Sequence, residues 1–129
     1  MKMLVYFNGK FISHEEIKVS PFDRAFLFSD SVYEALRTYN GKFFRLGDHL
    51  KRLKFSLKEL DITFNDFDRI EEICCKLSDI NSITPDYSVY LQISRGVSFP
   101  RTHHYGGTLS PNVFAYVKLI KDNSKEIND

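Results

Sequence analysis

The sequence contains no tryptophan and only two cysteines, Cys74 and Cys75, which are adjacent. Neighbouring cysteines bridge each other only under strain, and this pair matches neither a disulfide framework nor the ligand spacing of a zinc site. A reducing compartment is the simplest interpretation. The apolar run at residues 3–7 ends at Asn8-Gly9, which makes it too short for a signal peptide or a membrane span. We therefore expect a cytoplasmic protein that does not enter a membrane.

An excess of charge is also absent, because 18 Lys and Arg against 17 Asp and Glu give a formal net charge of +1. A chain without a basic field is not expected to bind nucleic acid. The four histidines show neither HxH nor HExxH spacing, so we expect no metal site. No glycine-rich stretch matches a dinucleotide or phosphate-loop fingerprint.

What is present indicates one compact domain. The 129 residues are 43% hydrophobic and include 12 Phe and 7 Tyr, enough for a sizeable core with some rings left for a pocket or an interface. Residues 121–129 are charged and polar with nothing to bury. We expect a domain at 1–120 followed by a polar linker or tail at 121–129.

Two Asn-Gly pairs predict tight hairpin turns. The first separates short apolar runs at 3–7 and 11–12, and the second follows an alternating strand at 31–39 that returns at 42–46. That alternating strand carries polar residues on both faces, which is typical of a sheet edge or a cleft border. Further strands are expected at 16–19, 87–94 and 112–120. The long connection at 95–110 is expected to be functional or mobile.

Leucine spacing predicts a helix at 48–60, capped by Gly47 or Asp48. A second helix is expected at about 65–81, with Asn65 as its N-cap and Pro85 separating it from the next strand. Strands, then two helices, then strands favour an α+β fold with a largely antiparallel sheet and two main helices on one face.

Three features of the predicted loops and elements suggest binding of an anion. The loop at 95–104 places two arginines and two histidines beside Gly and Pro, and a guanidinium can hold a carboxylate bidentately. Arg52 stands at the border of the apolar face of the first helix, and Tyr33 with Glu34 lies in the two-sided polar strand. The plainer alternatives are a solvated basic loop, a surface arginine and a packing tyrosine.

Six stretches resemble, in order and at plausible spacing, the N-terminal half of class IV pyridoxal-phosphate aminotransferases. That family includes D-amino acid aminotransferases, branched-chain aminotransferases and aminodeoxychorismate lyases. The stretches are 6–11 (YFNGKF), 19–34 (VSPFDRAFLFSDSVYE), 37–46 (RTYNGKFFRL), 48–53 (DHLKRL), 92–96 (QISRG) and 100–101 (PR). The resemblance spans nearly the whole chain.

The resemblance implies roles for four residues. Arg52 matches the arginine that binds the phosphate of pyridoxal 5'-phosphate. Tyr33 matches a tyrosine that contacts the substrate carboxylate in D-amino acid aminotransferases. Arg101 and His103 match an Arg-x-His pair that holds the same carboxylate, and in those enzymes the pair reaches across a homodimer interface. The interval from Arg95 to Arg101 is one residue longer here, with Phe99 as a plausible insertion, so the stereochemistry of the substrate stays open.

In this family the Schiff-base lysine and the carboxylate that charges the pyridine nitrogen lie in a second domain. No lysine of this chain resembles that one, so no catalytic residue is assigned here and the chain alone is expected to be inactive. The leading hypothesis is the N-terminal domain of an enzyme that transfers an amino group between an amino acid and a 2-oxo acid. A non-catalytic domain for dimerisation and anion binding, and the N-terminal half of an aminodeoxychorismate lyase, remain as alternatives.

Overall fold

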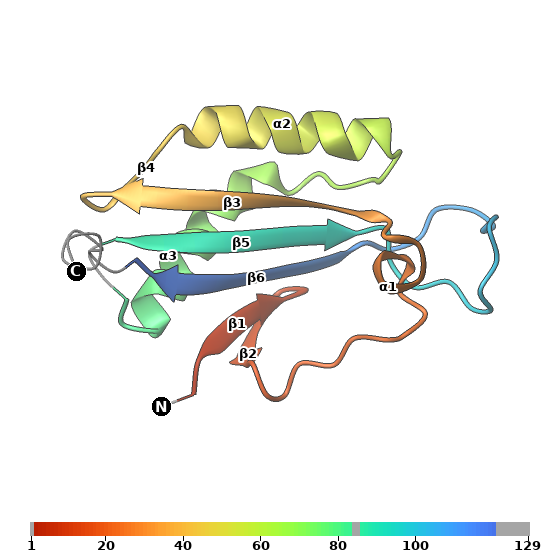
Figure 1. The fold of residues 1–129 in the computed structure, drawn as a ribbon, viewed down its shortest axis with the longest axis horizontal. Coiled ribbons are helices and arrows are strands. Elements are labelled where there is room, and N and C mark those ends of the chain that lie inside the picture. Colours follow the sequence, from red (N-terminus) through yellow and green to blue (C-terminus); the bar gives the residue numbers. More distant parts are fainter. Residues whose placement is uncertain (1, 84–85, 121–129) are drawn as a thin grey trace, which may run out of the picture.

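The computed structural model describes residues 2–83 and 86–120 and shows an α+β fold built on one six-stranded sheet (Figure 1). The strand order is β2-β1-β6-β5-β3-β4, and every neighbouring pair is antiparallel. The strands are β1 (Leu4–Phe7), β2 (Lys10–Ser13), β3 (Ser31–Tyr39), β4 (Lys42–Phe43), β5 (Tyr87–Ser94) and β6 (Asn112–Leu119).

Both main helices lie on one face of the sheet, as the sequence pattern predicts. Helix α2 (Leu46–Glu59) packs over β3, and α3 (Ile70–Ile80), entered through the 3-10 turn η1 (Phe67–Arg69), packs over β1 and β6 (Figure 1). A short helix, α1 (Arg24–Phe28), stands at the end of the sheet where β3 begins. The other face of the sheet is open within the described residues.

The core lies between the sheet and the two helices. Leu53 and Leu57 of α2 and Leu77 of α3 are at most 2% exposed, and they meet the inward-facing residues of the central strands. Those strand residues alternate along the chain and are Leu36, Val89, Leu91, Ile93, Ala115 and Val117. Successive side chains of a strand point to opposite faces of the sheet, so these residues face the helices and their neighbours in the chain face outward.

Both Asn-Gly pairs turn hairpins, because both residues of each pair adopt positive φ. Asn8 and Gly9 have φ of 48° and 92°, and Asn40 and Gly41 have φ of 53° and 79°.

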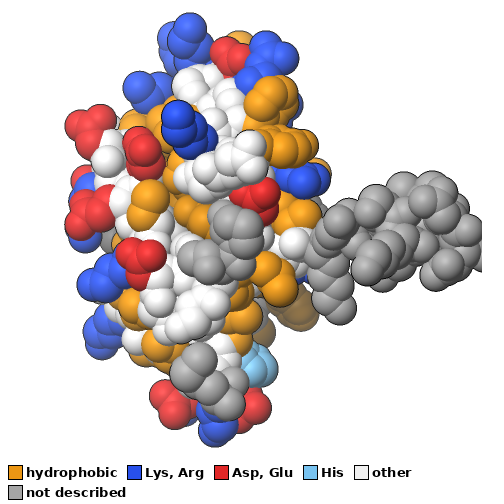
Figure 2. Space-filling view, turned by 90° about the vertical axis from the view of Figure 1, so that its left-hand side faces the viewer, with side chains coloured by type: hydrophobic (Ala, Val, Ile, Leu, Met, Phe, Trp, Pro, Cys, Tyr) orange, Lys and Arg blue, Asp and Glu red, His pale blue; other side chains and the backbone are white. Residues whose placement is uncertain are grey.

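At the end of the molecule that carries the second turn, hydrophobic and charged side chains interleave on the surface (Figure 2).

Four sequence-based expectations are wrong. No strand forms at 16–19. The amide of Glu16 closes a turn on the carbonyl of Ser13, and the backbone of the exposed residues that follow pairs with no strand of the described chain. The strand at 42–46 is shorter, since β4 ends at Phe43. Helix α2 begins at Leu46 instead of Asp48, because Arg45 with φ of 54° is its N-cap. Asn65 caps nothing, and η1 begins only at Phe67.

The predicted boundary at Pro85 and the tail at 121–129 lie outside the described residues. Among residues 2–83 and 86–120, no helix has the length and apolar character needed to cross a membrane.

Candidate functional site

Strand β3 presents chemistry on both of its faces. Its odd-numbered residues face outward and its even-numbered residues face the helices, so Tyr33 is 64% exposed while Glu34 is 6% exposed. Tyr33 lies against the ring of Tyr90 with 5.5 Å between centroids. A carboxylate that points into a hydrophobic layer is costly unless charged groups partner it.

Helix α2 supplies the partners of Glu34. The Nε of Arg52 donates to both carboxylate oxygens at 2.9 and 3.0 Å, and its Nη2 lies 2.8 Å from Oε1. The Nδ1 of His49, one turn earlier, lies 3.0 Å from Oε1. The hydrogen bond and the charge of Glu34 raise the pKa of Arg52 above its usual value. The Arg52 side chain is 64% exposed, and among the described residues its Nη1 has no hydrogen-bond partner.

The outer edge of β3 is largely uncovered beside this cluster. The two-residue strand β4 pairs only with Thr38 and Tyr39, so within the described chain no strand pairs with residues 32–36 on that side. A ligand at this edge could meet Arg52 from the helix face and Tyr33 from the open face. Sequence reasoning expected an edge or a cleft border here, and the structure shows an edge.

The loop at 95–110 carries the other two predicted residues. The Arg101 guanidinium lies over the ring of Phe28 at 4.4 Å, and the His103 ring lies 5.5 Å from the same ring. Both side chains are exposed, and within the described chain neither makes a hydrogen bond. Phe28 ends α1, so these two side chains lie against the end of that helix, while the loop as a whole extends outward at the same end of the sheet (Figure 1).

Two buried arginines attach this loop to the rest of the fold. The Nη1 and Nη2 of Arg24 donate to the carbonyls of Thr102 and His103 at 2.8 and 3.3 Å. Arg95 donates to both oxygens of Asp30 and to the carbonyls of Leu60 and Asp61. The Nε of Arg24 also donates to Asp30 at 3.3 Å. The hydrogen bond from Arg95 to Asp30 raises the pKa of Arg95.

The structure therefore brings Arg52 close to β3 and places Arg101 beside His103, but it does not join the two groups. Among the described residues, no contact links Tyr33 to Arg101 or to His103. The sequence pattern singled out Glu34 only together with Tyr33 and gave it no role of its own, and it did not single out Arg24 or Asp30. An acid at an inward position of an alternating strand was the signal that could have identified Glu34, because such a group requires a partner.

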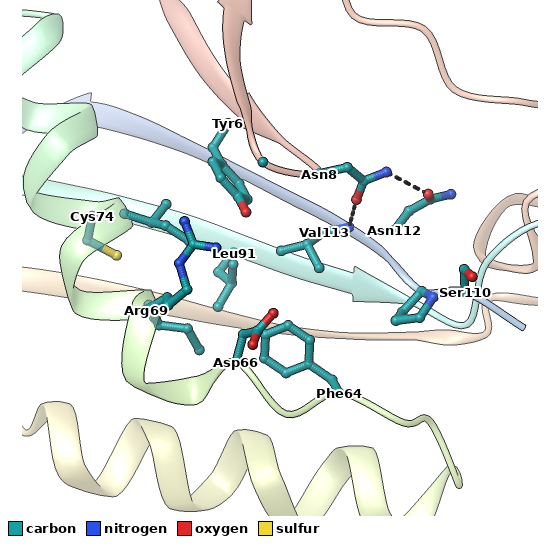
Figure 3. A pocket seen from close by; sticks show the side chains of 14 residues that line it. Tyr6, Asn8, Phe64, Asp66, Arg69, Cys74, Leu91, Ser110, Asn112 and Val113 are labelled. Atoms are coloured by element: carbon teal, nitrogen blue, oxygen red, sulfur yellow. Dashed lines mark hydrogen bonds between the residues drawn. The ribbon is translucent and has the colours of Figure 1, made fainter.

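A separate cavity of about 430 Å³ opens between the sheet and the start of α3 (Figure 3). Its floor includes Tyr6 and Leu91, and the side chains of Asp66 and Arg69 lie at its rim (Figure 3). None of its lining residues belongs to the edge of β3. In the described ranges, no group of three or more His, Cys, Asp or Glu side chains is placed to hold a metal ion.

Comparison with known proteins identifies the family. The model of the family described as amino-transferase class IV matches residues 31–129, which is most of the chain. The chain belongs to this family. Class IV membership implies pyridoxal phosphate dependence for the family, and it confirms the resemblance that the six sequence stretches indicated.

Individual relatives agree with this assignment. A D-alanine aminotransferase from Bacillus licheniformis is 40% identical over 126 residues, which cover 96% of this chain and 44% of that protein. A D-alanine aminotransferase from Staphylococcus aureus (strain N315) is 36% identical over 116 residues, 88% of this chain and 40% of that protein. The chain thus spans less than half the length of these relatives.

Solved structures show the same fold. The branched-chain amino acid aminotransferase from Escherichia coli superposes with a TM-score of 0.81 at 23% identity, covering 93% of this chain and 42% of that one. A hypothetical aminotransferase from Mycobacterium tuberculosis, in its PLP-bound form, superposes with a TM-score of 0.73 at 21% identity, covering 97% and 42%. At these identities the likeness supports the fold alone.

Proposed function

We propose that this chain is the N-terminal part of a class IV aminotransferase that moves an amino group between an amino acid and a 2-oxo acid. The observation that carries the proposal is the uncovered edge of β3, where Arg52 is held by the buried carboxylate of Glu34. One side of the guanidinium is thereby fixed, and Nη1 stays available for an anion. Family membership supports the same conclusion.

The residues present fit a phosphate group at this edge. Arginine held in one orientation is suited to a phosphate dianion, because its donors lie in a rigid plane and lose little freedom on binding. Arg52 would hold the cofactor phosphate, and Glu34 and His49 would hold Arg52. Bound pyridoxal phosphate supplies an electron sink for the α-carbon of the amino acid. The Schiff-base lysine would come from a part of the protein that this chain does not include.

Tyr33, Arg101 and His103 would orient the substrate carboxylate in a homodimer. The absence of any contact between Tyr33 and the other two within the described chain agrees with a site completed by a second copy. The open sheet face offers an apolar surface for that copy, with a hollow of about 320 Å³ lined by Phe7, Val19, Phe26, Gln92 and Phe114, among others. Phe26, which lines this hollow, is 75% exposed. The named relatives suggest D-alanine as a first substrate to test.

The test uses the complete protein that contains this chain, purified with pyridoxal phosphate. We expect transfer of the amino group from D-alanine to 2-oxoglutarate, and Arg52→Gln should weaken retention of the cofactor on dialysis. Arg45→Gln, on the exposed start of α2, is the matched control and should retain it. Sedimentation should give a dimer, and mixing a Tyr33→Phe variant with an Arg101→Gln variant should restore one intact site per heterodimer.

Other outcomes would assign a different function. Activity with L-leucine but not D-alanine would reverse the proposed stereochemistry, and pyruvate release from aminodeoxychorismate would place the protein among the lyases. A dimer that binds phosphate but catalyses none of these reactions would support a non-catalytic binding domain. A stable borohydride-reduced adduct on a lysine of residues 1–129 would overturn the proposal that this lysine lies elsewhere.

A further inference from the structure

We propose that Arg24 is a positioning residue that sets the location of Arg101 and His103, and with it the affinity for the substrate carboxylate. This inference rests on the proposed function, because it concerns the two residues that would hold that carboxylate. Arg24 lies on α1, and its side-chain hydrogen bonds go to Asp30, Thr102 and His103, not to Glu34 or Arg52 at the edge of β3. It acts on the loop backbone and would not touch the substrate.

The loop depends on an outside anchor because it has almost no internal structure. Between Phe99 and Ser110 the described chain forms no helix, no strand and no backbone–backbone hydrogen bond. The side chains of Arg101 and His103 contact only the ring of Phe28 among the interactions that the structure shows. Their location therefore follows from the location of their backbone.

Arg24 provides that anchor at the backbone of residues 102 and 103. Its two terminal nitrogens donate to two consecutive carbonyls, Thr102 and His103, which belong to the residue between the predicted ligands and to one of the ligands themselves. Its backbone amide donates to the carbonyl of Gly96 at 2.9 Å, so the same residue also fixes the base of the loop. A planar guanidinium can hold two such oxygens at once, whereas an ammonium acts as a point donor.

Arg24 is itself held rigidly. It is 6% exposed, its Nε lies 3.3 Å from Asp30, a carboxylate that it shares with Arg95, and its guanidinium lies 4.4 Å from the ring centroid of Phe28 and 4.8 Å from that of Tyr105. Arg101 stacks on the same Phe28 ring at 4.4 Å. The anchor and one predicted ligand thus share a single aromatic platform, so a displacement of Arg24 is transmitted to Arg101 through contact as well as through the backbone.

The test compares Arg24→Lys with the unmodified complete protein. Lysine keeps the charge beside Asp30 but cannot span both carbonyls. We expect the KM for D-alanine and the inhibition constant of propionate, a simple carboxylate, to rise together about tenfold, which corresponds to about 1.4 kcal/mol. The kcat should change less than about twofold, because the lost interaction is made equally in the ground state and the transition state.

A second readout does not depend on activity. Cleavage by trypsin after the exposed Arg101 should accelerate in Arg24→Lys, while hydrogen exchange at the paired amides of β3 and β5 stays unchanged. Arg45→Lys is the matched control, because that arginine is exposed and pairs only with Asp48 on the surface of α2. It should alter neither the kinetics, nor the cleavage of the loop, nor the exchange in β3 and β5.

The outcomes separate this inference from the proposed function. Unchanged cleavage of the loop by trypsin, or unchanged KM and inhibition constants in an active protein, would overturn the role of Arg24 and leave the proposed function intact. Faster exchange spread over β3 and β5, with kcat falling alongside KM, would show a general structural role and also overturn it. Faster cleavage of the loop by trypsin, with unchanged exchange in β3 and β5, in a protein without aminotransferase activity would retain Arg24 as the anchor and reject the proposed function.

Discussion

The guanidinium of Arg52 and the carboxylate of Glu34 form a bidentate pair that joins helix α2 to strand β3. The pair is asymmetric, because the Glu34 side chain is 8% exposed and the Arg52 side chain is 64% exposed. The buried carboxylate of Glu34 has lost its water and depends on Arg52 for a charged partner, whereas the exposed guanidinium of Arg52 still contacts water. The pair therefore fixes the arginine at the sheet edge.

Arg52→Gln should lower the free energy of unfolding more than Arg45→Gln does, because the mutation leaves the buried carboxylate of Glu34 with the His49 ring as its remaining side-chain hydrogen-bond partner in the described chain. Arg45→Gln is the control, since Arg45 pairs with an exposed Asp48 and surface pairs contribute about 0–1 kcal/mol. Urea unfolding of both variants measures the difference. Equal losses in the two variants would contradict the importance of burial in the Arg52–Glu34 pair.

Gly96→Ala should destabilise the protein by more than about 1 kcal/mol and should increase the rate at which trypsin cleaves the loop after Arg101. Gly96 has φ of 113°, and a Cβ there would lie 2.1 Å from the carbonyl oxygen of Ser110, where the two ends of the loop meet. Gly106→Ala is the matched control within the same loop, because no atom lies within 4 Å of the corresponding Cβ. Similar digestion rates for the two variants would show that the loop base tolerates the added carbon.

Protonation of Asp86 should account for part of the stability that the unmodified protein loses in acid, and the Asp86→Asn variant should not show that part of the loss. Asp86 accepts hydrogen bonds from the Gly41 amide at 3.0 Å and from the Thr38 hydroxyl at 3.3 Å, and the former chiefly lowers its pKa below the ordinary 3.8. A carboxylate with a lowered folded-state pKa stabilises the fold above its unfolded pKa and loses that contribution as the pH falls through the folded value.

The stability difference between the unmodified protein and Asp86→Asn should therefore be constant above about pH 5 and shrink as the pH falls below 3.8. Urea midpoints across this range measure it. Asp68→Asn serves as the control, because Asp68 is exposed and its side chain accepts no hydrogen bond in the described part of the chain. A difference that grew on acidification would have the wrong sign.

The two adjacent cysteines should differ in reactivity despite their proximity. Burial raises the pKa of Cys74 to about 12, and Cys74 is 1% exposed. Burial also raises the pKa of Cys75, but that thiol is exposed. Because the thiolate is the reactive form, alkylation by iodoacetamide at pH 8 should be slow and should modify Cys75 alone, with Cys74 reacting only in urea. Mass spectrometry after partial alkylation distinguishes the sites, and early modification of Cys74 would contradict its burial.

Local signals in the sequence were sufficient for the hairpins and the helix faces. Asn8-Gly9 and Asn40-Gly41 specify their turns through positive φ, and the leucines of α2 specify its buried stripe. The start of α2 was missed because Arg45 adopts a left-handed conformation, which is not a preference of arginine. The short helix α1 was missed because five residues carry too little periodicity.

The candidate site was less predictable because its parts are distant in sequence. Arg52, Tyr33, Arg101 and His103 came from resemblance to the family, and their roles stay predictions. The contacts of Arg24 with Thr102 and His103 join positions 78 and 79 residues apart, which no local pattern reports. The position of β6 between β1 and β5 is likewise a long-range pairing.

The uncovered edge of β3 also affects how the protein behaves during folding and purification. Within the described chain, no strand pairs with residues 32–36 on the side away from β5, and this edge forms a template to which an extended segment of another molecule can add. Val32 and Leu36 alternate with outward-facing residues along that edge, and the inward-facing charge of Glu34 between them is paired with Arg52. A ligand or protein segment that occupies the edge would therefore suppress aggregation as well as complete a site, and solubility at high concentration should improve when the edge is filled.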